Sequence, residues 1–323
     1  METETTGGRL HVLAATPDTA HMGFFDNSLT PVLRIRSGDT VAIETMMLMG
    51  GHLRGDLTLD ELLHLRTEYR SEGRSGHSLT GPIYVEDARP GDVLEVRVLR
   101  LVPYPHGVHY VLPGAIGAGT LPEEFPQGHV MGFQWNSGDL TAPFGRGIAL
   151  PLRPFLGVMA VAPAEDGELN ANAPGPHGGN MDLKELVEGA VLYLPVFVNG
   201  ALFSTGDAHA LQGDGEVSGT ALETSMKEAR LQFVVRHDLK LDLPMAETPT
   251  HWITMGFHPD LDEAARIALR GAVAWLAQTR GLGRLEAYSL CCLAVDMRIT
   301  QLVDGNKGVH AMIPKELFEG RFA

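Results

Sequence analysis

Glycine and proline interrupt this chain so often that few segments are long enough for anything except short strands. The 323 residues include 38 glycines and 20 prolines, and short apolar runs alternate with turn-forming residues along most of the sequence. This alternation is typical of an all-β sandwich or barrel. We therefore expect a mainly β fold in which a jelly-roll-like β-sandwich holds most of the chain.

Two similar segments predict β-hairpins in the first hundred residues. In each, an apolar run, a Gly-Asp turn and an alternating run follow one another: Pro31–Ile35, Gly38-Asp39 and Val41–Thr45, then Pro82–Val85, Gly91-Asp92 and Val93–Leu99. Two strands joined by such a turn usually pair with each other. Residues 103–180, in contrast, contain Pro-Gly clusters and little periodicity, which predicts a loop-rich segment.

The last third of the chain has a different pattern. Asp260–Thr279 and Leu285–Ala294 have the apolar spacing of helices, with Asp260 or Asp262 as the first cap. With strands at 252–257, 297–303 and 309–313, they predict a strand-helix-helix-strand-strand α+β lobe. We place a soft boundary near residue 240, between a β-rich domain (1–240) that binds metal and substrate and the lobe (241–323). Further helices are expected over 57–70 and 181–189.

The strongest chemical signal lies in residues 202–216, which carry Asp207, His209, Asp214 and Glu216 among glycines. They follow an apolar run (191–198) that predicts a buried strand, so we expect a loop that displays a site. Asp207 and His209 are two apart, and in an extended chain both would leave the same face. An oxygen and an imidazole nitrogen placed in this way suit a divalent metal such as zinc. Glu216 would be a third ligand or a proton carrier.

Charge and cysteine content restrict the partners and the compartment. The formal net charge of −15 argues against nucleic acid and anionic membranes as partners. Cys291 and Cys292 are adjacent and rarely bridge in that arrangement, which suits a reducing compartment. The N-terminus lacks a signal-like pattern, and the most apolar stretch, 189–203, is interrupted by Pro195, Asn199 and Gly200. We therefore expect a cytoplasmic protein.

Several blocks in a fixed order resemble one family. Residues 192–217 (LYLPVFVNGALFSTGDAHALQGDGEV) are similar to the signature of the acetamidase/formamidase family, and so are 154–159, 178–182, 81–92 and 21–45. The resemblance covers nearly the whole chain. It departs at Met46-Met47-Leu48-Met49, where the family is often polar, and at Ala160, where glycine is usual.

The resemblance implies a β-rich fold, hydrolysis of a linear carboxamide to a carboxylate and ammonia, and a bound divalent metal. Zinc is the expected metal and calcium the alternative. Asp207 and His209, with His21, would hold the metal, and Glu216 would carry the proton. The residues expected to contact the amide are Asp26, Glu44, Asn180 and Met47.

Several of these residues have ordinary structural alternatives. Asn180 would cap the helix expected at 181–189, His77, His106 and His109 would be loop residues, and Met46, Met47 and Met49 would be core rather than the wall of an apolar acyl pocket. We also expect a homo-oligomer, because irregular segments such as 103–180 often contact a neighbouring subunit.

Two other functions fit the same residues. One is a non-catalytic jelly-roll protein whose loop holds a structural metal or a sugar. The other is a hydrolase of another C–N bond, such as a cyclic amide. A serine or cysteine nucleophile is not expected, because the chain has no Gly-x-Ser-x-Gly elbow and both cysteines lie in an apolar helical stretch.

Overall fold

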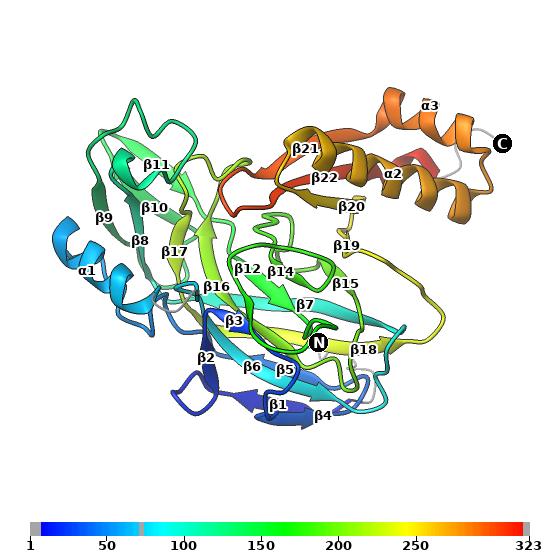
Figure 1. The fold of residues 1–323 in the computed structure, drawn as a ribbon, viewed down its shortest axis with the longest axis horizontal. Helices are drawn as coiled ribbons and strands as arrows, with labels where there is room; N and C mark the ends of the chain where they lie inside the picture. Colours follow the sequence, from blue (N-terminus) through cyan, green and yellow to red (C-terminus); the bar gives the residue numbers. More distant parts are fainter. Residues whose placement is uncertain (1–7, 71–73, 319–323) are drawn as a thin grey trace.

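Two large sheets packed against each other form most of the molecule (Figure 1). In the computed structural model, which describes residues 8–70 and 74–318, each of these sheets has nine strands. The first sheet has the order β1 (Leu10–Leu13), β5 (Thr40–Ile43), β18 (Met226–Arg236), β7 (Val93–Pro103), β15 (Val191–Pro195), β19 (Met245–Glu247), β20 (His251–His258), β22 (Lys307–Pro314), β21 (Asp296–Gln301).

The second sheet carries the strand that the sequence motif marks. Its order is β14 (Gly178–Asn180), β12 (Phe155–Ala160), β16 (Phe203–Leu211), β17 (Leu222–Thr224), β8 (His106–Val111), β9 (His129–Gln134), and β6 (Ser78–Val85) joins β16 to β2 (Ala20–Met22) and β4 (Leu33–Ile35). Two small sheets complete the set: β10 (Thr141–Gly145) with β11 (Ile148–Pro151), and β13 (Leu169–Asn170) with β3 (Phe24–Phe25). The predicted mainly β fold class is confirmed.

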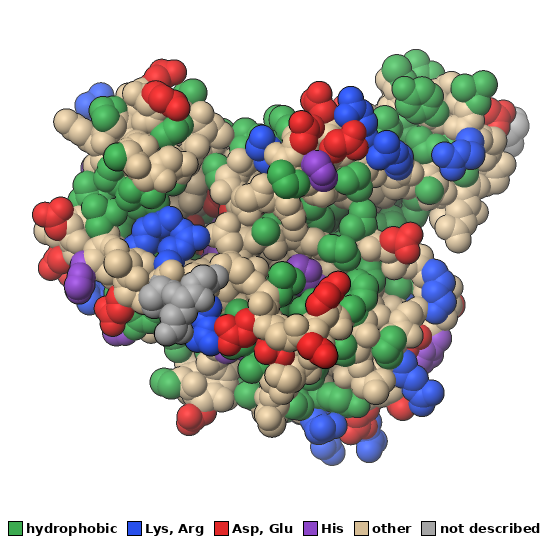
Figure 2. Space-filling view, viewed as in Figure 1, with side chains coloured by type: hydrophobic (Ala, Val, Ile, Leu, Met, Phe, Trp, Pro, Cys, Tyr) green, Lys and Arg blue, Asp and Glu red, His purple; other side chains and the backbone are tan. Residues whose placement is uncertain are grey.

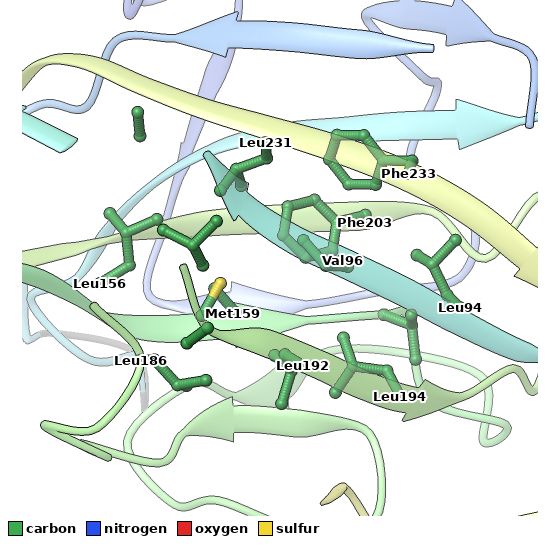
Figure 3. Packing of buried hydrophobic residues seen from close by; sticks show 14 of the residues in the cluster. Leu94, Val96, Leu156, Met159, Leu186, Leu192, Leu194, Phe203, Leu231 and Phe233 are labelled. Carbon is green, nitrogen blue, oxygen red and sulfur yellow. The ribbon is translucent and has the colours of Figure 1, made fainter. Parts of the chain in front are cut away.

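The main hydrophobic core lies between the two sheets (Figure 3). The first sheet contributes Leu94 and Val96 from β7 and Phe233 from β18, and the second contributes Met159 from β12 and Phe203 from β16. The rings of Phe203 and Phe233 meet edge to face, with centroids 5.0 Å apart. This packing fixes the position of β16, because Phe203 begins that strand.

Both predicted hairpins are wrong. β4 pairs with β6 in the second sheet, whereas β5 pairs with β1 and β18 in the first. Likewise β6 belongs to the second sheet and β7 to the first. Each Gly-Asp turn therefore carries the chain from one sheet to the other, and Asp39 and Asp92 make the same contact in it, accepting the N–H of Arg36 and Arg89. The local pattern could not distinguish this connection from a hairpin, because a strand's partner depends on the whole sheet.

The expectations for residues 103–189 also need correction. The supposedly loop-rich stretch contains β8 to β14, which are short or glycine-containing strands that give little periodicity. The helix expected over 181–189 is not formed, since these residues make irregular turns. Asn180 therefore ends strand β14 and caps no helix.

The α-helices of the described residues are α1 (Leu59–Tyr69), α2 (Leu261–Arg280) and α3 (Arg284–Ala294). A capping box between Thr58 and Glu61 begins α1, and Asp260 caps α2. None of these helices has the length and apolar character needed to cross a membrane. The N-terminal residues whose sequence lacks a signal pattern lie outside the described residues.

The strand-helix-helix-strand-strand order of the C-terminal lobe is confirmed, and Figure 1 shows the lobe projecting at the upper right. Helix α2 packs closely on β20 at Gly256, where an added Cβ would lie 2.1 Å from Ala264 O. The lobe's strands extend the first sheet through the β15–β19 and β19–β20 pairings. The domain boundary near residue 240 stays a prediction.

Candidate functional site

A small pocket of about 120 Å³ gathers acidic and histidine side chains from four parts of the chain. Asp207 and His209 lie on β16, Glu223 lies on β17, and Glu216 lies on the loop that joins these strands. Asp182 follows β14, Asp304 lies in the β21–β22 turn, and His77 precedes β6. All but His77 are buried.

The structure brings Asp207 and His209 together as expected, but on a strand instead of a loop. Oδ2 of Asp207 lies 3.4 Å from Nε2 of His209. β16 is central in its sheet and is made mostly of small residues; a Cβ at Gly206 would lie 2.1 Å from Ser78 O on β6. The close approach of neighbouring strands therefore holds the pair rigidly.

Glu223 completes this side of the pocket, and its position follows from strand register. β17 pairs with β16 so that Glu223 lies opposite His209. Its Oε2 is 3.3 Å from His209 Nε2. Two carboxylates thus face one imidazole nitrogen.

The other imidazole nitrogen faces a second set of acids. Nδ1 of His209 lies 3.6 Å from Oδ1 of Asp182. Burial, opposed in part by the charge of His209, raises the pKa of Asp182 to about 7. Burial and the charge of Asp182 also raise the pKa values of Glu216 and Asp304 well above their ordinary range.

Gln212 determines which nitrogen of His209 carries the proton. Its Nε2 donates to the backbone carbonyl of Asp182 at 2.9 Å, which turns its Oε1 toward His209 Nδ1 at 3.0 Å. An amide oxygen only accepts, so Nδ1 donates and the Nε2 lone pair of the neutral ring points at Asp207 and Glu223. Burial alone would lower the pKa of His209, but the charges of Glu223 and Asp207 raise it well above its ordinary value.

Backbone strain is concentrated at this pocket. Asp182, Asp207 and Glu216 have positive φ angles of 51°, 51° and 44°, as does Met49 at 57°. Residues other than glycine avoid this region, at a cost of about 1–3 kcal/mol each, and the strain tends to occur at functional sites.

Gly157 on β12 leaves room for the acids. A Cβ there would lie 2.5 Å from Asp182 Oδ1 and 2.7 Å from Asp207 Oδ2. The space that these two carboxylates occupy exists because residue 157 has no side chain.

The pocket suits a divalent cation. Two overlapping groups, Asp207/His209/Glu223 and Asp182/His209/Glu216, each place their ligand atoms within 4.8 Å of one another. Asp182 Oδ1 and Glu223 Oε2 are buried without a hydrogen-bond partner among the described residues. Buried carboxylate oxygens of this kind are costly unless a cation or a proton neutralises them.

Four residues predicted for the site lie elsewhere, and His21 and Asp26 are the first two. His21 belongs to neither metal-ligand group and does not line the pocket; its Nε2 is 3.1 Å from Ser204 Oγ. Burial lowers the pKa of His21 to about 4. The Asp26 carboxylate turns back on its own segment and accepts the N–H of Ser28 at 2.7 Å.

Glu44 and Met47 line a separate cavity of about 1030 Å³ together with Met46 and His106. Tyr104 donates its hydroxyl hydrogen to Glu44 at 2.7 Å. Neither Glu44 nor Met47 lines the His209 pocket, so the structure does not place them with the acids.

Asn180, Met49 and His77 do line the His209 pocket. Asn180 Nδ2 donates to Asn172 O, and its Oδ1 is buried without a hydrogen-bond partner among the described residues. His77 was expected to be an ordinary loop residue, but its Nε2 lies 3.8 Å from Asp207 Oδ2. His109 instead donates to Ala221 O.

Sequence reasoning missed Glu223 and Asp304. A hairpin register between residues 203–211 and 222–224 would have placed Glu223 opposite His209. Asp304 is more than ninety residues from β16 in sequence and had no detectable signal, because the C-terminal lobe brings it to the pocket.

Comparisons with known proteins agree on one family. Residues 14–174 and 168–320 match the model of the Acetamidase/Formamidase family. The chain is 24% identical to a formamidase of Methylophilus methylotrophus, covering 90% of this chain and 88% of that protein. It is 29% identical to an acetamidase of Mycolicibacterium smegmatis over 44% of this chain, and the match spans about half of that relative's length (49%).

A solved structure extends the likeness to the whole fold. The crystal structure of an acetamidase from Bacillus halodurans superposes with a TM-score of 0.86 at 31% identity. The superposition covers 95% of this chain and 98% of that one.

Proposed function

The chain belongs to the acetamidase/formamidase family, and on that premise we propose that it hydrolyses a linear carboxamide to a carboxylate and ammonia. The observation that carries this proposal is the buried Asp207/His209/Glu223 group, which faces a pocket with protonatable acids on its other side. Protonatable acids beside a candidate metal group favour a proton-transfer role over binding alone.

We assign Asp207, His209 and Glu223 as the residues that would hold the divalent metal. The Nδ1–H of His209 is directed to Gln212, so its Nε2 is free to act as a ligand, an arrangement common at metal sites. One nitrogen and several carboxylate oxygens favour zinc, and calcium is the alternative. When bound, the cation would activate water and polarise the amide carbonyl.

Glu216 is the proposed proton carrier. Burial and the charge of Asp182 raise its pKa, which strengthens it as a base, and in its deprotonated form its carboxylate would accept a proton from the attacking water. Delivery of that proton to the amide nitrogen lets ammonia leave in place of a strongly basic amide anion. Oδ1 of Asn180, which has no hydrogen-bond partner in the part of the chain that the structure describes, would accept an N–H of the substrate amide.

Ammonia release from a panel of amides tests this function. The purified protein should release ammonia from at least one linear amide, lose this activity with a chelator, and recover it with zinc. Release only from a cyclic amide such as 2-pyrrolidinone would identify the other C–N hydrolase. Stoichiometric bound metal without release from any substrate would favour the non-catalytic binding protein.

We further propose that the enzyme is a cytoplasmic homo-oligomer. α3 exposes Leu285, Tyr288 and Leu293, with 77%, 56% and 82% of their surfaces accessible, and Figure 2 shows hydrophobic atoms gathered over this helix at the upper right. Apolar patches of this kind often mark subunit contacts. Cys291 and Cys292 are both free, which suits a reducing compartment.

A further inference from the structure

Two arginines of α1 line the same pocket as His209. Arg66 and Arg70 are four residues apart on the last turn of the helix and its cap, so they project from one face. We propose that they bind the carboxylate of an anionic substrate, so that this enzyme acts on short amides that carry a carboxylate on the acyl side. The proposal rests on the amidase function proposed above.

Within residues 8–70 and 74–318, neither arginine has a carboxylate as its partner. Arg70 donates to the amide oxygen of Asn172 at 2.7 Å, and among the described residues neither guanidinium forms an ion pair. Arg74, by contrast, pairs with Glu168. Arg66 is half-buried, and burial together with the charge of Arg70 lowers its pKa. Two arginines on one helix face, with no ion-pair partner among the described residues, suit an anion.

Tyr110 connects the arginines to the acid cluster. It is buried and lines the pocket. Burial, followed by the charge of Glu223, raises the pKa of its phenol, while Arg66 and Arg70 act in the opposite direction. Because the arginines, this phenol and the acids all line one small pocket, a single small ligand can reach from the acids to the arginines. Figure 2 shows basic side chains gathered beside α1 at the left of the view.

Pocket size restricts the length of the substrate. The volume of about 120 Å³ is well below the usual range for ligand pockets of about 300–1,000 Å³. A substrate with its amide at the acids and its carboxylate at the arginines can therefore hold only one or two carbons between these groups. In the reaction, the oxygen of water bonds to the acyl carbon, the C–N bond breaks, and nitrogen leaves as ammonia with the transferred proton. The product is a short dicarboxylate.

Malonamate and isovaleramide provide a matched pair of substrates. They have the same number and arrangement of heavy atoms, and only malonamate carries the charge. We expect wild-type kcat/KM to be higher for malonamate. Arg66→Met should lower the malonamate-to-isovaleramide ratio by roughly tenfold to a hundredfold, the scale of a lost charge-assisted hydrogen bond. Arg54→Met, which removes an exposed arginine from the separate large cavity, should leave the ratio unchanged.

A binding measurement separates this inference from the proposed function. Calorimetry of the metal-loaded protein should show malonate binding more tightly than isovalerate, with the difference reduced by Arg66→Met and by Arg70→Met. The inference would be overturned if the wild type preferred isovaleramide, or if neither arginine variant changed the malonamate-to-isovaleramide ratio. Either result would leave the amidase function intact. Absence of ammonia from every amide would reject the amidase function, and the malonate comparison would still decide whether the arginines bind an anion.

Discussion

At the scale of single residues, the chemistry of this protein depends on how His209 is surrounded. Gln212 fixes its tautomer, Asp207 and Glu223 face the free lone pair, and Gly157 leaves space for the acids. Each of these contacts can be removed on its own, and each leads to a different expected defect.

Removal of a proposed ligand should remove the metal. Asp207→Ala, His209→Ala and Glu223→Ala should each lose stoichiometric metal and ammonia release, while circular dichroism still reports the wild-type fold. Asp26→Ala, which deletes a carboxylate outside the pocket, is the control and should retain both. Metal analysis of the purified variants provides the readout, and full metal occupancy in any of the three would remove that residue from the ligand set.

Glu216→Gln should separate metal binding from proton transfer. We expect metal content to stay at the wild-type level and turnover to fall at least roughly a hundredfold, the scale of a lost general acid–base residue. Loss of metal would instead make Glu216 a ligand, as the Asp182/His209/Glu216 group allows. Turnover within about twofold of wild type would exclude a proton-carrying role.

Gly157→Ala should damage the site without touching any acid. Its methyl group would collide with Asp182 and Asp207, so we expect weaker metal binding and reduced turnover in a folded protein. Gly213→Ala is the control, because a Cβ there meets open space. Metal affinity measured by competition with a chelator should fall only in the first variant; equal affinities in both would show that the two carboxylates can shift without loss.

At the scale of elements, the contact of helix α2 with β20 determines whether the lobe can pack on the extended sheet. Gly256→Ala would place a methyl group 2.1 Å from the backbone oxygen of Ala264, which cannot move without the helix. We expect the free energy of unfolding to fall by about 1–3 kcal/mol, as in overpacked cores. Denaturant titration should show a lower midpoint with an unchanged slope.

Gly271→Ala tests the specificity of that effect at the same interface. Its Cβ would lie 3.2 Å from the Cβ of Thr254, a contact that a shift of a few tenths of an ångström relieves, and alanine also favours the helix by about 1 kcal/mol over glycine. We therefore expect little change or a small gain in stability. A similar loss of unfolding free energy in both variants would show that the close contact of Gly256 with α2 matters no more for stability than the contact of Gly271 with Thr254.

At the scale of the whole molecule, the buried acids link stability to pH and metal. The pKa of Asp182 is raised from 3.8 to about 7, and those of Glu216 and Asp304 are raised as well. Between about pH 4 and 7 these three acids bind more protons in the folded metal-free protein than in the unfolded chain, so their contribution to the free energy of unfolding falls as pH rises through this window. The raised pKa of His209 adds to this effect above about pH 6.5. His21, His177 and His310, whose pKa values burial lowers to about 4, act in the opposite direction between about pH 4 and 6.5.

Urea titrations at pH 5 and 7.5 would test this pH dependence. Between pH 5 and 7.5 we expect the chelated wild type to lose more stability, or gain less, than chelated Asp182→Asn, because the substitution removes a group that holds its proton more tightly in the folded state. Added zinc should stabilise the wild type more at pH 7.5 than at pH 5, because metal ligands must be deprotonated. An identical change in stability in the two chelated proteins would contradict the raised pKa of Asp182.

The sequence alone determined the features that depend on neighbours along the chain. Glycine and proline spacing predicted a β fold, apolar periodicity predicted α1, α2 and α3, and the Asp207-x-His209 spacing predicted two side chains on one strand face. Each of these depends on backbone geometry over a few residues, which a local pattern records.

Only the tertiary structure decided which distant segments meet. The strands of each expected hairpin belong to different sheets, and Glu44 and Met47 line another cavity. His21 lies beside Ser204, whereas Glu223 and Asp304 line the His209 pocket. Sheet pairing and inter-sheet packing are set by the sum of many weak contacts between residues far apart in sequence, so no local pattern contains them. The site is built where those contacts converge, which explains why the motif on β16 could be recognised early and its partners could not.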